Sequence, residues 1–168
     1  MTPLIAVIKQ GNLKAVQALI RMKVSPCVYW KDKGDNVLPL EEAVWLGEDK
    51  ISRLLMENGA CETKNWDFGI LHGAIAKKMF GVVRLAIKKG ASLDSICAGC
   101  TPLCAALTCG RKGTGDIRMV RLLLSAKADL NKTTGGPRYS NNKYGKLSHL
   151  DVAEKYSNKK CLTLILEK

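Results

Sequence analysis

Five short segments with a common pattern recur along the chain, each carrying a leucine at the same place. The segments are Thr2-Pro3-Leu4, Leu38-Pro39-Leu40, Gly69-Ile70-Leu71, Thr101-Pro102-Leu103 and Ser148-His149-Leu150. Their leucines lie 36, 31, 32 and 47 residues apart. A period of about 33 residues is typical of arrays of two-helix units. The spacing therefore predicts stacked helix pairs, and it favours surface recognition over catalysis.

A second apolar set follows each of these leucines after eleven to sixteen residues, allowing five inserted residues in the fourth unit. Its members are Ala15-Val16 with Leu19-Ile20, Ile51 with Leu55-Met56, Val82-Val83 with Ala86-Ile87, Met119-Val120 with Leu123-Leu124, and Cys161-Leu162 with Ile165-Leu166. Apolar residues at steps of three and four mark one face of a helix. Glycines such as Gly11 and Gly47 fall where the first helix of a unit should end. Each unit is therefore predicted to be a helix, a turn and a second helix.

The repeated segment resembles the T-P-L-H-x-A stretch of the ankyrin repeat. The likeness is strongest at Thr101-Pro102-Leu103, at Gly59-Ala60 and Gly90-Ala91, and at Leu150-Asp151-Val152-Ala153. The resemblance implies an all-α ankyrin-repeat solenoid of stacked helix-turn-helix units with hairpin loops. It covers residues 1–168 as a single domain.

Five units are expected within this domain. Their approximate bounds are 1–30, 31–63, 64–95, 96–132 and 143–168. Two stretches exceed the repeat and are interpreted as loop insertions, 111–115 and 133–142. The Gly, Pro, Ser and Asn content of the longer insertion is typical of a loop.

The chain is strongly basic. It has 27 Lys and Arg against 15 Asp and Glu, a formal net charge of +12. Such a surface favours acidic partners, phosphates or nucleic acid. Basic runs never exceed two residues, however, and lysines such as Lys50 and Lys88 fall on predicted second helices, whose outer faces are simply solvated. Charge alone therefore leaves the class of partner open.

The resemblance implies that a partner binds the concave side, which hairpin tips and the ends of first helices form. The candidate partner-binding residues are Lys9, Trp45, Trp66, Phe68, Lys77, Tyr144, Lys155 and Tyr156. The aromatic residues Trp45, Trp66 and Phe68, flanked by Lys9 and Lys77, have the composition of an interface hot spot. The alternative is that Trp45 or Phe68 packs into the seam between repeats.

Two functional hypotheses follow from this surface. The first is a monomeric protein–protein interaction module that acts as an adaptor or competitive inhibitor, with a partner whose surface is acidic. The second is binding of a phosphorylated small ligand or nucleic acid, with Lys9, Lys77 and Lys155 supplying charge and Trp45 or Trp66 stacking on a base.

Catalysis has little support in the sequence. The chain has two histidines. His72 occupies the His position of the repeat, where we expect it to hydrogen-bond between adjacent repeats, and His149 takes the Pro position of the last unit. No Ser or Cys nucleophile has a recognisable base and orienting partner, and no phosphate-binding glycine loop is present. The sequence therefore predicts no enzyme activity and no cofactor.

Four cysteines have a spacing that resembles that of zinc ligands. Cys97, Cys100, Cys104 and Cys109 form C-x2-C-x3-C-x4-C. Cys104 and Cys109 are five residues apart on a predicted helix and share no face well, so free buried thiols are the preferred interpretation. The seven cysteines of the chain lack the spacing of a disulfide scaffold, which favours a reducing cytoplasmic or nuclear location.

Two further expectations concern membranes and modification. No apolar run approaches the length needed to cross a bilayer, so no membrane association is expected. Ankyrin-type repeats can be substrates for asparaginyl hydroxylation, and the spacing from Leu123 to Asn131 matches that pattern. The alternative is that Asn131 serves only as a hairpin residue, since Asn tolerates the backbone angles of turns.

Overall fold

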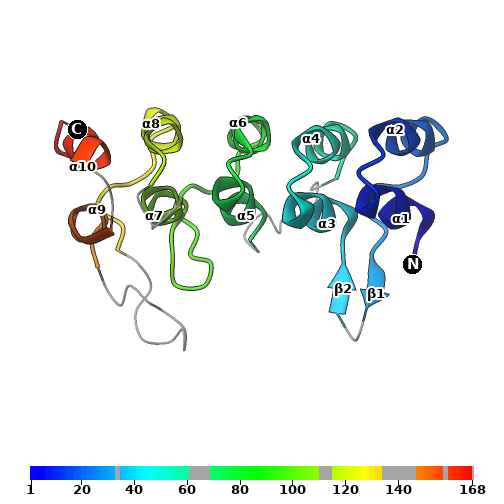
Figure 1. Cartoon of the computed structure of the whole chain (residues 1–168), viewed down its shortest axis with the longest axis horizontal. Helices are drawn as coiled ribbons and strands as arrows, with labels where there is room; N and C mark the ends of the chain where they lie inside the picture. The colour runs from blue at the N-terminus through cyan, green and yellow to red at the C-terminus, as the bar shows by residue number, and fades with distance from the viewer. Residues whose placement is uncertain (33–34, 61–68, 110–114, 134–146, 157–158, 168) are drawn as a thin grey trace.

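The structure, a computed structural model, describes residues 1–32, 35–60, 69–109, 115–133, 147–156 and 159–167. These residues form five successive helix pairs and one two-stranded sheet (Figure 1). The pairs are α1 (Pro3–Lys9) with α2 (Leu13–Arg21), α3 (Pro39–Leu46) with α4 (Asp49–Glu57), α5 (Ile70–Ala76) with α6 (Phe80–Lys88), α7 (Pro102–Thr108) with α8 (Ile117–Ser125), and α9 (His149–Tyr156) with α10 (Lys159–Leu166). The predicted all-α solenoid of stacked helix pairs is confirmed.

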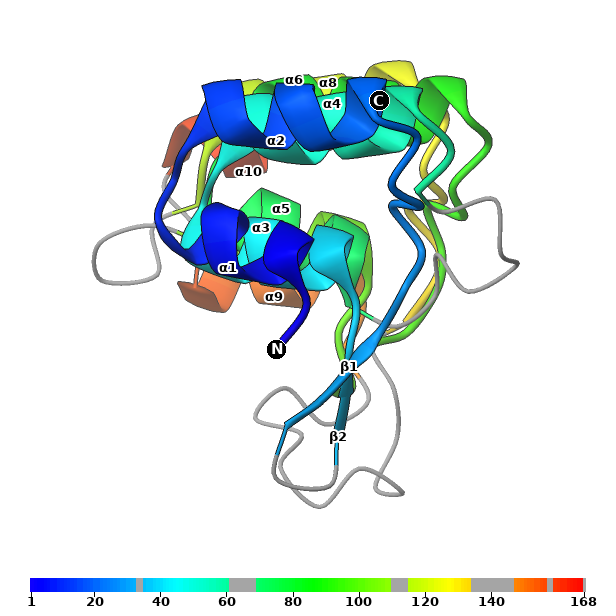
Figure 2. The ribbon, with the colours of Figure 1, turned by 90° about the vertical axis from the view of Figure 1, so that its right-hand side faces the viewer.

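The helices form two layers. The first helices of the pairs stack in one row, α1 on α3, α3 on α5, α5 on α7 and α7 on α9. The second helices form the other row, and Figure 2 shows both rows from the end of the stack. A hairpin of β1 (Trp30–Asp32) and β2 (Asp35–Val37) extends from the side of the first helices, with Trp30 opposite Val37.

The start of a first helix depends on its capping residue. Thr2 and Thr101 each accept a backbone N–H of their own helix on the side-chain hydroxyl, at 3.4 and 3.1 Å. The proline that follows lacks the N–H that would otherwise be unpaired in the first turn. Leu38 has no such acceptor, and here Glu41 Oε2 accepts the Leu38 N–H at 3.2 Å instead. A carboxylate one turn into α3 thus replaces part of the missing cap.

A left-handed residue ends each of the first four second helices. The residues are Lys23, Gly59, Gly90 and Lys127, with φ of 60°, 90°, 83° and 67°. In this region a Cβ atom lies too close to the backbone carbonyl, so glycine is preferred. Two of the four positions nevertheless carry lysine.

The core lies between the two rows and between successive pairs. Four of the five repeated leucines, Leu4, Leu40, Leu71 and Leu103, are buried in it. Leu150 differs and is 37% exposed, whereas its neighbour His149 is buried. Leu150 therefore does not continue the buried series, and His149 is the residue of this segment that lies in the α7–α9 seam.

Candidate functional site

The predicted lysines lie at the ends of first helices. Lys9 is in the last turn of α1, Lys77 is the C-cap residue of α5, and Lys155 is in the last turn of α9. All three are exposed. We call the exposed C-terminal ends of these helices, with Trp45 and Leu46 of α3, the odd-helix surface. Because the first helices stack side by side, their ends form one continuous row.

Trp45 is the most conspicuous side chain on this surface. It is 70% exposed, and the next residue, Leu46, is 47% exposed. Leu40, Ala43 and Val44 take the buried face of α3, which leaves Trp45 on the outer face. The alternative that Trp45 packs into the seam between repeats is wrong, since the helical rotation places it away from the core.

The ends of α1, α3 and α5 lie next to one another. A Cβ atom added at Gly47, the C-cap of α3, would lie 3.9 Å from Lys77 Cδ, so the aliphatic chain of Lys77 passes the end of α3. Lys9 Nζ lies 3.8 Å from Glu42 Oε1 and so has a partial counter-charge. Among the described residues, no carboxylate lies within ion-pair distance of Lys77. Positive charge thus flanks the apolar pair on both sides.

The far end of the row is less open. Lys155 Nζ lies 5.3 Å from the ring centroid of Tyr156, a cation–π distance. Tyr156 is half-buried and packs against the core, so its ring is partly structural. At the end of α7, the Thr108 hydroxyl donates to the Cys104 carbonyl at 2.9 Å and is turned inward. The strongest exposed part of the odd-helix surface therefore lies on α1, α3 and α5.

Three predicted residues, Trp66, Phe68 and Tyr144, lie outside the described residues. So do most of the two loop insertions proposed from the sequence. Their assignment to a partner surface remains a prediction.

His72 makes the predicted bond between repeats. Its Nε2 atom lies 2.8 Å from the carbonyl oxygen of Cys100, which can only accept, so the imidazole donates. Burial lowers the pKa of His72 below its usual value, while the bond to Cys100 opposes that shift. His72 is therefore a structural link between adjacent repeats.

His149 makes a second link of this kind, which the sequence did not indicate. Its Nδ1 atom lies 3.0 Å from the Leu130 carbonyl and must donate, so the neutral ring accepts at Nε2. The donor there is the Thr101 hydroxyl, at 2.6 Å. Burial lowers the pKa of His149, with the Leu130 bond and the charges of Asp129 and Asp94 acting in the opposite direction. The one feature of the sequence that could have indicated this link is that His149 occupies the position where the repeat usually has proline.

The four closely spaced cysteines lie in different structural elements. Cys97 and Cys100 exchange backbone hydrogen bonds of 2.9 and 3.0 Å across a hairpin, and Cys104 is buried in α7. A hydrogen bond with Cys104 and burial raise the pKa of Cys100, and burial raises that of Cys109. No group of three metal-binding side chains is present in the described part of the chain. Protonated thiols of this kind act as small apolar side chains.

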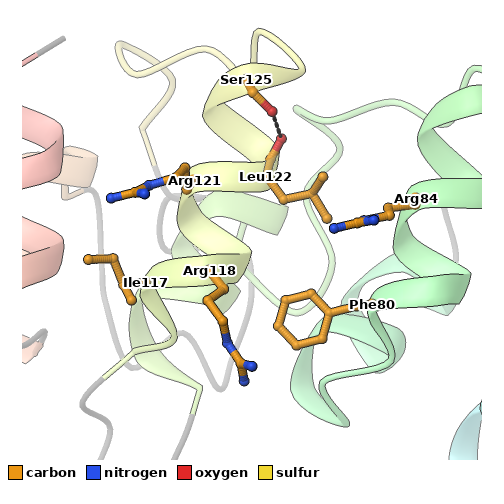
Figure 3. Close-up of a pocket in the computed structure, with 7 residues that line it drawn as sticks. All are labelled: Phe80, Arg84, Ile117, Arg118, Arg121, Leu122 and Ser125. Atoms are coloured by element: carbon orange, nitrogen blue, oxygen red, sulfur yellow. Dashed lines mark hydrogen bonds between the residues drawn. The ribbon is translucent and has the colours of Figure 1, made fainter.

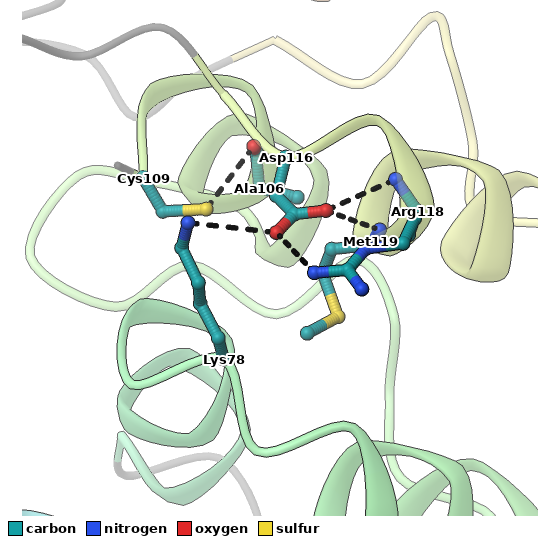
Figure 4. A network of polar contacts seen from close by, with 6 residues as sticks. All are labelled: Lys78, Ala106, Cys109, Asp116, Arg118 and Met119. Atoms are coloured by element: carbon teal, nitrogen blue, oxygen red, sulfur yellow. Dashed lines mark hydrogen bonds and ion pairs between the residues drawn. The ribbon is translucent and has the colours of Figure 1, made fainter. Parts of the chain in front are cut away.

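Asp116 organises the start of α8 (Figure 4). Its Oδ1 atom accepts the backbone N–H of Arg118 at 3.0 Å and of Met119 at 3.4 Å. Its Oδ2 atom pairs with Lys78 Nζ at 3.6 Å and Arg118 Nη2 at 3.5 Å. Burial opposes ionisation, but the hydrogen bonds and charge of Arg118 hold the pKa of Asp116 below its usual value. This arrangement fixes α8 against the end of α5. Both carboxylate oxygens of Asp116 are occupied by contacts that hold the fold together.

Asn131 is exposed. Its backbone N–H donates to Asp129 Oδ1 at 2.8 Å, in a turn that also joins Asp129 N–H to Asp94 Oδ1 at 3.0 Å. Hydroxylation of Asn131 remains a prediction, and the turn itself is compatible with the alternative structural role.

The region around α7 and α8 has a recognised sequence pattern. The Ankyrin repeat family model matches residues 98–135. That stretch contains the end of the Cys97–Cys100 hairpin and all of α7 and α8. The stacked helix pairs around it are consistent with the all-α fold of ankyrin repeats. Ankyrin repeats typically bind other proteins and are generally non-enzymatic.

No curated protein matches the chain. In the described segments, no helix has both the length and the apolar character that a membrane span requires.

Proposed function

We propose that the chain is an adaptor or competitive inhibitor that binds another protein through the odd-helix surface. The observation that carries this proposal is Trp45, a 70% exposed tryptophan next to an exposed leucine. Tryptophan is among the residues that most often dominate the energy of protein interfaces. An aromatic ring that is exposed to this extent contributes little to the packing of the core.

The geometry of the row supports the same proposal. The helices α1, α3 and α5 are fixed by the core, so Lys9, Trp45 and Lys77 need little ordering when a partner binds. The partner we expect offers an apolar pocket for Trp45 with acidic residues at its rim. The net charge of +12 would speed association with such a surface.

The test compares two exposed apolar side chains. Met22, at the end of α2, is 74% exposed and lies in the other layer, so Met22→Ala is a matched control for Trp45→Ala. A partner captured with the intact chain should bind the Trp45→Ala variant at least about tenfold more weakly and the Met22→Ala variant with little change. Equal affinity for both variants would exclude the odd-helix surface as the main site.

The alternative is a phosphorylated small ligand or nucleic acid on the same surface. The free charge of Lys77 and the open face of Trp45 favour it, since single-stranded bases stack on such rings. Binding to oligonucleotides that is strong and falls steeply with salt would support this alternative over the adaptor. We further propose a cytoplasmic or nuclear location, in keeping with free thiols such as Cys27 and Cys97.

A further inference from the structure

A hollow of about 620 Å³ opens between α6 and α8, in the row of second helices (Figure 3). Its apolar lining comes from Phe80, Ile117 and Leu122, and its basic lining from Arg84, Arg118 and Arg121. This volume is within the usual range of about 300–1,000 Å³ for binding sites in proteins. None of these six side chains belongs to the odd-helix surface.

The hollow exists because α6 and α8 stand apart. The helices α4 and α6 pack directly together, and Asp49 Oδ1 of α4 accepts the Val82 N–H of α6 at 3.2 Å. By contrast, α6 and α8 barely touch. The guanidinium carbon of Arg118 lies 4.9 Å from the ring centroid of Phe80, and this stacked pair fills the space at one end of the two helices.

The charged residues that line this hollow are all positive. Neither α6 nor α8 contains an acidic residue. Arg118 is partly committed to Asp116, 3.5 Å away, but within the described residues no carboxylate reaches ion-pair distance of Arg84 or Arg121. Two exposed guanidinium groups therefore border an apolar floor without a counter-charge.

The basic lining continues over α8. A second hollow of about 250 Å³ lies between α8 and α10 and shares Ile117 and Arg121 with the first. It adds Lys160 and Leu164, and its one acidic member is Glu167. Ile117 and Arg121 thus border both hollows, and we call the two hollows on either side of α8 the outer groove.

We propose that the outer groove binds an acidic peptide segment of another protein. A large apolar side chain of that segment enters the hollow between α6 and α8, and its carboxylates pair with Arg84 and Arg121. Arginine suits this task because its planar guanidinium group binds a carboxylate through two parallel hydrogen bonds. The apolar floor supplies the part of the affinity that salt does not screen.

A protein segment fits the groove better than nucleic acid does. Base stacking needs an open aromatic face, and the ring of Phe80 is already covered by Arg118. A phosphodiester strand also has no aliphatic side chain to place on the apolar floor of Phe80, Ile117 and Leu122. The outer groove and the odd-helix surface lie on different layers, so both could be occupied at once, as an adaptor requires.

The test uses a fluorescein-labelled dodecapeptide of repeated Glu-Glu-Leu and measures its binding by fluorescence anisotropy. The variant is Arg84→Gln with Arg121→Gln, and the control is Arg21→Gln with Lys50→Gln. All four residues are exposed on second helices, and each pair removes the same charge. We expect the groove variant to bind about tenfold more weakly and the control to change by less than about twofold. Circular dichroism verifies that both variants keep their helices.

Several results would overturn the proposal. Among them are absence of peptide binding to the intact chain, equal weakening in both double variants, equally tight binding of a Glu-Glu-Ser peptide, and displacement of the peptide by a tighter-binding oligonucleotide. The Trp45→Ala variant separates this proposal from the proposed function. It should bind the peptide normally, and loss of peptide binding there would place the peptide on the odd-helix surface instead.

Discussion

At the scale of single residues, Thr101 and His149 join the fourth and fifth helix pairs. The Thr101 hydroxyl accepts the Cys104 N–H at the start of α7 and donates to His149 Nε2. The other ring nitrogen donates to Leu130, so every polar atom of this buried group is paired. A proton added at Nε2 would replace an acceptor with a donor and break the bond from Thr101. The seam therefore favours a neutral imidazole, in the same direction as the burial that lowers the pKa of His149.

This requirement predicts that stability falls in mild acid. Burial lowers the folded-state pKa of His149 and of His72, whereas the unfolded value is about 6.5. Above that pH both states are unprotonated and stability is complete. As the pH falls below it, the unfolded state takes up protons that the folded state excludes, and stability is lost.

The measurement is urea unfolding between about pH 7.5 and pH 5.5, where these histidines titrate. The intact chain should lose stability towards the lower pH, and His149→Gln should lose less. The double variant with His72→Gln should be nearly independent of pH in this range. An intact chain whose stability does not change with pH would show that neither imidazole is held neutral by the fold.

At the scale of helices, the lysines in left-handed conformation offer a direct comparison. Lys127 ends α8 with φ of 67°, at the position where Gly90 ends α6 with φ of 83°. Lys127→Gly should stabilise the protein by about 0.5–1 kcal/mol, because glycine adopts this conformation without strain. Denaturant unfolding at neutral pH measures the change.

Lys88→Gly is the control for this prediction. Lys88 is an exposed lysine in the last turn of helix α6, where glycine should destabilise by up to about 1 kcal/mol. The two substitutions are chemically the same but should have opposite signs. If both substitutions destabilise the protein, the side chain of Lys127 adds more to the free energy of unfolding than its strained backbone conformation subtracts.

At the scale of the whole molecule, the layers separate two kinds of surface. The odd-helix surface is a row of helix ends centred on Trp45, and the outer groove is a basic hollow bordered by Arg84 and Arg121. Both belong to a rigid array, because each pair covers the apolar face of its neighbour. The excess of positive charge is spread over both layers, and few described carboxylates neutralise it.

This excess predicts that added salt stabilises the fold. A net charge of +12 destabilises the compact state through self-repulsion, which salt screens. Raising sodium chloride from about 20 to 200 mM should raise Tm by about 2–4 °C, equivalent to about 1 kcal/mol for a chain of this size. Chloride is used because sulfate could bind the arginines specifically. A lower Tm in salt would mean that attractive ion pairs outweigh the repulsion.

The sequence by itself determined the helical solenoid and the places where its helices begin and end. Steps of three and four residues define a helix face, and capping or left-handed residues act within one turn, so these signals are local. The same register located Lys9, Trp45 and Lys77 at helix ends. It also anticipated the bond of His72, which joins its repeat to the carbonyl of Cys100 in the next one.

Only the tertiary structure decided which side chains meet across the seams. His149 contacts Thr101 and Leu130, 48 and 19 residues away, and it is buried whereas the next residue, Leu150, is 37% exposed. The outer groove likewise depends on the distance between α6 and α8, which no local pattern encodes. Its one trace in the sequence is the absence of acidic residues from both helices. Spacing between helices results from the packing of whole pairs, so it appears only when the array is assembled.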